Sequence, residues 1–155
     1  MAITQAMARS FKKELLLGIH NFGTTNTRAG TGADTFRVAL YTSSATMDNT
    51  TTAYSVTNEI TNTAGTAYVA GGEAITIVTA PTLTGVETTA WLDFTDVTWS
   101  TASITANGAL IYNDTAAGNP AVAVLAFGAD KTATAGNFTI VWPAGNSTDA
   151  IIKIQ

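Results

Sequence analysis

The amino-acid sequence predicts a mainly β protein, an antiparallel β-sandwich or barrel with one N-terminal α-helix. Three observations support this fold class: short apolar runs recur between clusters of turn-forming residues, threonine is abundant, and only the N-terminal stretch has a helical period. Charged residues make up 12% of the 155-residue chain, about half the usual share. Threonine is β-branched and suits the exposed face of a strand, so it supplies much of the polar surface.

Short apolar runs follow one another through the chain after residue 35, each bounded by Gly, Asn, Asp, Pro or Thr. Such spacing is typical of an antiparallel sandwich or barrel. The predicted strands cover residues 36–42, 73–79, 90–99, 109–113, 121–128, 137–143 and 150–155. Between them, residues 42–72 are expected to form a long loop with some irregular strand, ending in a turn or bulge at Ala70–Gly72.

Two of these runs are unusual because both of their faces are apolar. In "AVAVLAF" (residues 121–127) no polar residue alternates with the apolar ones, as it should in a strand with one wet face. We therefore expect this strand to be covered on both sides, by an opposing sheet and by either the helix or another subunit. The C-terminal "AIIKIQ" (residues 150–155) is a poor exposed edge unless something pairs with it.

Near the N-terminus, apolar residues recur every four positions, which predicts an amphipathic helix. Thr4 is the expected N-cap, and Gly23 is the expected end of the helix. The apolar stripe packs either on the β-domain of the same chain or on a partner or sister subunit. In the second case the candidate interface residues are the stripe and the nearby cations, namely Ile3, Met7, Arg9, Phe11, Lys12, Lys13, Leu15 and Ile19.

The chain divides into an N-terminal helix or arm (residues 1–22), a linker loop (residues 23–35) and a β-sandwich body (residues 36–155). Charge follows a similar division. Residues 1–37 carry five basic and two acidic side chains, whereas the remainder carries two basic and nine acidic ones. A basic start on an acidic body suits an acidic partner or the acidic face of a neighbouring copy.

Composition also argues against several functional classes. The chain has no cysteine, so disulfides, thiolate metal sites and cysteine nucleophiles are excluded. Its pI of about 4.6 and its few cations argue against nucleic-acid binding. No stretch has the length of a membrane span, and the cations near the start do not precede an apolar signal sequence. We therefore expect synthesis in the cytoplasm, with no membrane partner.

Few residues are candidates for chemistry, so we expect no enzymatic activity, no cofactor and no metal. His20 is the only histidine, and its ordinary interpretation is a helix C-terminal histidine favoured by the helix dipole. Asp93 and Asp96 lack the ligand density of a calcium loop and are expected on a solvent face. Trp91 and Trp99 could stack on sugar rings, although packing in the core or between subunits is the commoner role of tryptophan.

Several segments in order resemble a family of small virion structural proteins of tailed bacteriophages. The resemblance extends from Ile3 to Ile154, and its most distinctive segments are "GALIYN" and "FGADKTATAGNFTI". It implies a β-rich, non-enzymatic component of the phage particle, without cofactors and located in the virion.

Two functions are compatible with this resemblance. The first is a capsid decoration or cement protein that stabilises the head by binding the lattice of the major capsid protein, or neighbouring virion proteins, as a homo-oligomer for which a trimer is favoured. The second is a tail, neck or fibre component that binds a receptor or glycan, for which Trp91 and Trp99 are the candidate stacking residues.

Overall fold

The computed structural model describes residues 2–23, 32–61, 67–83 and 88–155. Two antiparallel sheets are the main secondary structure of the described chain, and they do not close into a barrel. The predicted fold class is therefore confirmed, and the sandwich is the correct one of the two alternatives. The elements are β1 (Ala6–Met7), α1 (Arg9–Leu16), β2 (Phe36–Tyr41), β3 (Glu73–Ile75), β4 (Ile77–Thr82), β5 (Ala90–Phe94), β6 (Val97–Asn113), β7 (Ala121–Ile140) and β8 (Ile152–Ile154).

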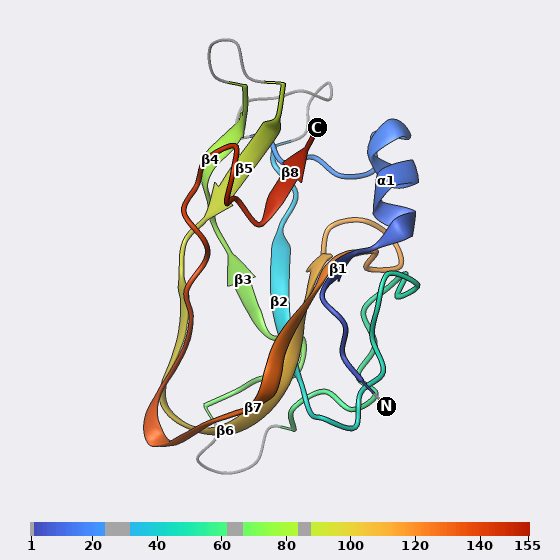
Figure 1. Cartoon of the computed structure of the whole chain (residues 1–155). Helices are drawn as coiled ribbons and strands as arrows, with labels where there is room; N and C mark the ends of the chain where they lie inside the picture. Colours follow the sequence, from blue (N-terminus) through green and yellow to red (C-terminus); the bar gives the residue numbers. More distant parts are fainter. Residues whose placement is uncertain (1, 24–31, 62–66, 84–87) are drawn as a thin grey trace.

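The larger sheet has the strand order β1-β7-β6-β2-β3, and the smaller sheet has the order β4-β5-β8. A long ribbon of β6 and β7 dominates the molecule. At one end it lies between β1 and β2, and at the other it curves toward the smaller sheet (Figure 1). Several register shifts interrupt its pairing. Such bulges bend and twist a ribbon, so they account for the curvature.

The chain passes three times between the two sheets, the third time between β7 and β8. In the first two passages it leaves the larger sheet at Thr76, between β3 and β4, and re-enters it at Thr95 and Asp96, between β5 and β6. These two corners are tied together because the Thr95 backbone N–H donates to the Thr76 carbonyl at 2.8 Å. Trp142 makes two hydrogen bonds at the second corner. Its indole N–H donates to the Thr95 carbonyl, and its backbone N–H donates to the Asp96 carboxylate.

The ribbon has two parts with different burial. In its basal segment, residues 108–113 and 121–125, every residue is buried. The expectation that "AVAVLAF" (residues 121–127) is covered on both sides is therefore confirmed for residues 121–125, whereas Ala126 and Phe127 are half-buried. In its distal segment, residues 97–106 and 128–140, only one face is covered. On the covered face, the buried residues include Trp99, Ile104 and Ala106. On the other face, Thr98 and Thr105 are exposed, and so are most residues of β7 between 128 and 140.

The structure also corrects several predicted boundaries. The predicted strand over residues 90–99 is two strands separated at Thr95 and Asp96, while residues 100–108 and 129–136 belong to the ribbon although no strand was predicted there. Residues 42–61 and 67–72 form the expected long loop, joined to the body by isolated bridges such as Tyr41 to Glu59. The expected turn at Ala70–Gly72 is present. Most of the predicted linker, residues 24–31, lies outside the described residues.

Candidate functional site

The helix α1 is shorter than predicted and starts from a strand. Residues 6–7 form β1, which pairs with β7, so the helical period in this stretch overestimates the helix. Backbone hydrogen bonds fix the start of α1, from Ala8 N–H to the Val122 carbonyl and from Arg9 N–H to the Asn49 carbonyl, both at 2.9 Å. Gly18, with a φ of +67°, follows the helix where Gly23 was expected to end it. Thr4 precedes β1 and caps no helix.

The predicted interface residues divide into a packed group and an exposed group. Phe11 is fully buried and belongs to the core of the chain itself. The other apolar residues of the stripe are half-buried, and three of them, Ile3, Met7 and Leu15, pack against the core. Ile19, the fourth, is also half-buried. The three cations, Arg9, Lys12 and Lys13, are exposed. Much of the stripe therefore packs on the β-domain of the same chain, and the basic side chains face solvent.

A groove lies between α1 and the edge strand β8. Its floor is a small cavity of about 110 Å³ with no polar lining, formed by Phe11, Leu15, Phe22, Pro81, Ala90, Trp91, Leu92, Ile152 and Ile154. Its mouth has a volume of about 520 Å³ and is lined by Met7, Lys12, Leu15, Leu16, Lys153, Ile154 and Gln155. Leu15 and Ile154 line both cavities, so floor and mouth are neighbours. We call this feature the α1–β8 groove.

The rim of the α1–β8 groove carries exposed apolar side chains. Leu16 is 91% exposed and Ile154 is 48% exposed. Leu17, which follows the helix, is 62% exposed. Two cations, Lys12 and Lys153, accompany them on the rim. Sequence reasoning missed Leu16, Lys153 and Ile154 as site residues, although the apolar character of residues 150–155 was the signal that could have found them.

The two candidate stacking tryptophans have different environments, and neither is a free platform. Trp99 is only 4% exposed and packs between Tyr68 and Phe138 in the core. It therefore offers no ring face to a sugar. Trp91 is half-buried and lines the floor of the α1–β8 groove, where its indole N–H is buried without a hydrogen-bond partner in the described structure. The structure does not bring these two residues together in one site.

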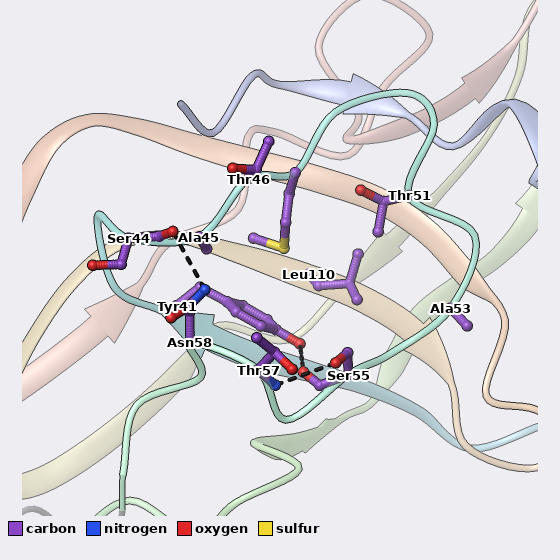
Figure 2. Close-up of a pocket in the computed structure, with 11 residues that line it drawn as sticks. Tyr41, Ser44, Ala45, Thr46, Thr51, Ala53, Ser55, Thr57, Asn58 and Leu110 are labelled. Carbon is purple, nitrogen blue, oxygen red and sulfur yellow. Dashed lines mark hydrogen bonds between the residues drawn. The ribbon is translucent and has the colours of Figure 1, made fainter. Parts of the chain in front are cut away.

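A second pocket, of about 290 Å³, lies where the long loop crosses β2 (Figure 2). The Tyr41 ring lies within it, next to Leu110, and the Tyr41 hydroxyl donates to the Ser55 carbonyl at 2.6 Å. Among the described residues, its rim carries hydroxyl and amide groups and no charged side chain: Ser44, Thr46, Thr51, Ser55, Thr57 and Asn58. Such a lining can hydrogen-bond an uncharged polar ligand.

Beside this pocket, Glu59 gathers three donors and anchors the long loop. Its carboxylate accepts from the hydroxyls of Tyr54 at 2.6 Å and Tyr68 at 2.7 Å, and from the Gly71 backbone N–H at 2.7 Å. Burial raises the pKa of the Tyr68 and Tyr54 hydroxyls, and the hydrogen bonds to Glu59 raise it further. A buried carboxylate needs such hydrogen-bond partners. The cluster therefore holds the long loop in place.

The turn that follows is held on its other side by the sheet. Arg37 donates to the carbonyls of Gly71 and Gly72, and the Tyr112 hydroxyl donates to the Gly71 carbonyl at 2.8 Å. Gly72 has a φ of +71°, and a Cβ at this position would collide with the Val38 carbonyl. Burial, followed by the negative charge of Asp114, raises the pKa of Tyr112 to about 12.

The single histidine joins the helix to the sheet. His20 lies beyond the end of α1, so it is not the helix C-terminal histidine that was expected. It is buried, with Nε2 at 2.9 Å from Glu14 Oε2 and Nδ1 at 3.2 Å from Asn113 Nδ2. Asn113 also donates to Asp34 Oδ2 at 2.7 Å. Both ring nitrogens are thus engaged inside the fold, where they hold α1 on β6.

No protein-family model, curated protein or solved structure matches this chain. Among the residues that the structure describes, His, Asp and Glu form no group of three or more able to hold a metal ion. Asp96, one of the two aspartates considered for calcium, instead accepts from the Trp142 backbone N–H. No helix in the described ranges is long and apolar enough to cross a membrane.

Proposed function

We propose that this protein is a non-enzymatic structural component of a tailed-bacteriophage virion, a decoration protein that binds the outside of the assembled head. The observation that carries the proposal is the α1–β8 groove, whose rim combines the exposed apolar residues Leu16 and Ile154 with cations on an otherwise acidic protein. Contiguous exposed apolar surface marks interaction sites more often than scattered residues do. Together with the resemblance of the sequence to small virion proteins, it favours attachment to a larger assembly.

Binding of this kind would stabilise the head by mass action. A protein that binds the assembled lattice but not the separated subunits shifts the equilibrium toward the lattice. Complementary charge on the partner would set the orientation and the association rate. The exposed cations Arg9, Lys12 and Lys13 suit an acidic surface on the major capsid protein or on a neighbouring copy.

Co-sedimentation with empty phage capsid shells tests the proposal. The wild-type protein should saturate the shells at a stoichiometry that matches the number of capsid subunits. Leu16→Glu should abolish most of this binding, because it puts a carboxylate into the exposed apolar rim. Val56→Glu is the matched control, since Val56 is also a large exposed apolar residue, at 67%, but lies on the long loop.

A tail, neck or fibre component is the second candidate, and the neutral hydroxyl-lined pocket of Figure 2 favours it. No saturable binding to shells by the folded wild-type protein would overturn the decoration proposal. Glycan binding that is lost in Ser55→Val or Thr57→Val, but kept in Leu16→Glu, would then support a receptor-binding role.

A further inference from the structure

We propose that the α1–β8 groove binds an extended, acidic and apolar peptide segment of a partner protein, which adds as a further strand to the free edge of β8. The inference deepens the proposed function, because it names the chemistry of the segment that the partner supplies. It rests on that function only in making the partner a virion protein.

The first support is the free edge of the smaller sheet. β8 pairs with β5 on one side, and on its other side no strand of the described chain pairs with it. Instead it faces the groove, with α1 beyond (Figure 1). An edge strand presents unpaired backbone N–H and C=O groups, which an extended peptide can use for main-chain hydrogen bonds.

The second support is the apolar lining next to that edge. Lys12 and Leu16 are four residues apart and so share one helix face, which forms the wall of the groove opposite Ile154. Leu15 continues the lining down to the floor, which has no polar surface. A strand laid between α1 and β8 would place alternate side chains into this apolar channel and the others toward solvent.

The third support is charge, which selects the occupant. Among the described residues that line the mouth, Lys12 and Lys153 carry charged side chains and none carries a carboxylate. Lys153 is exposed, and its ammonium also donates to the Thr148 carbonyl. Two copies joined edge to edge through β8 would bring their Lys153 side chains together, which disfavours self-pairing. A segment with carboxylates on its outward face would meet opposite charge. A membrane surface would use the leucines and lysines but not the free strand edge.

Trp91 provides an internal reporter of occupancy. Trp91 is one of the residues that line the floor of the groove, and in the β5–β8 ladder it lies opposite Lys153, a residue of the mouth. Trp99 and Trp142 are both buried elsewhere, in the core and at the sheet corner. A ligand in the groove should therefore change the fluorescence of Trp91, and Trp91→Phe should remove that change without removing the binding measured by calorimetry.

The test is a titration of the full-length protein with a blocked synthetic peptide of alternating glutamate and valine. We expect saturable binding that weakens with salt. Lys12→Glu and Lys153→Glu should each weaken it about tenfold, because reversal replaces an attraction with a repulsion. Lys131→Glu is the control, an equal change of charge at an exposed residue of β7. A peptide of the same pattern with N-methylated amides along one edge should lose most of the affinity.

Several results would overturn the inference. They are equal affinity for a lysine–valine peptide, an equal effect of Lys131→Glu, full affinity of the N-methylated peptide, or binding only to anionic lipid vesicles. None of these decides whether the protein attaches to the head, because shell binding is measured separately. If shells bind and the peptide does not, the partner uses another kind of surface. If the peptide binds and shells do not, peptide binding by the groove is supported and the decoration proposal is overturned.

Discussion

The basal and distal segments of the β6–β7 ribbon are made by the same two strands but are stabilised in different ways. The basal segment is buried on both faces and lies between β1 and β2 in the larger sheet. The distal segment covers the core with one face and exposes threonine, serine and lysine on the other. The difference shows that local sequence alternation reports which faces of a strand are covered, even within one continuous strand.

The largest effect should come from placing a charge in the basal segment. Val124 is fully buried and pairs with both Leu110 and Ala6. Val124→Asp would bury an unpaired carboxylate, at a cost of several kcal/mol, against a total stability of about 5–15 kcal/mol. We expect loss of the folded state, measured by circular dichroism and size-exclusion chromatography.

The same change in the distal segment is the matched control for Val124→Asp. Thr134 is an exposed residue of β7, so Thr134→Asp leaves its carboxylate in water. We expect a loss of less than about 1 kcal/mol in the free energy of unfolding. A folded Val124→Asp protein, or an unfolded Thr134→Asp protein, would contradict the division of the ribbon into these two segments.

A smaller effect should come from truncating the inner face of the distal segment. Ile104 is 1% exposed and pairs with Ala133. Ile104→Ala should lower the free energy of unfolding by about 2–5 kcal/mol, through lost apolar burial and the cavity left behind. Urea denaturation measures the change. Ser100→Ala, at an exposed position of the same strand, should change it by less than about 0.5 kcal/mol, and equal losses in both variants would show that the inner face is not packed.

The most graded effect should come from alkali, which acts on the basal side. Tyr112 belongs to the basal segment, Tyr41 pairs with Gly108 and Tyr54 stacks on Tyr112. Burial raises the pKa of all three above the ordinary value of 10.0, that of Tyr112 to about 12. The folded state holds these protons more tightly than the unfolded chain does. The free energy of unfolding should therefore stay at its maximum below pH 10 and decrease as the pH rises above 10.

Absorbance of the tyrosinate ion measures this titration directly. In the native protein it should develop at higher pH than in the urea-unfolded chain, and the urea midpoint should decrease from pH 10 toward about pH 12. Coincident titration curves in the two states would mean that the tyrosines are accessible in the folded protein.

Much of the β-sandwich could be predicted from the sequence because its strands contain dense apolar runs. The distal ribbon was missed in "ADKTATAG" (residues 129–136) because small and polar residues there look like a turn. They form a strand only because β6 pairs with them across the ribbon. Likewise, the four-residue period around Met7 predicts a helix, but pairing of Ala6 and Met7 with β7 makes this short piece a strand.

The candidate site could be predicted only in part, for a related reason. The cations Arg9, Lys12 and Lys13 were candidate interface residues, and they are exposed. The apolar stripe was the other part of the candidate interface, but its central residue, Phe11, is buried. Leu16, which broadens the stripe but was not among the candidate residues, is the most exposed leucine of the rim. The groove also needs β8, which is far away in the sequence, and no periodicity within either segment reveals that the two lie together.

The glycine pair at residues 71 and 72 has a consequence for finding relatives of this protein. Arg37, Tyr112 and Glu59 hydrogen-bond the turn. A side chain at Gly72 would clash with the backbone of β2. A chain that keeps this loop on this sheet therefore needs a glycine there. We expect divergent relatives with this loop to combine a Gly-Gly turn before β3 with a donor on β2 that can hold it, as Arg37 does here.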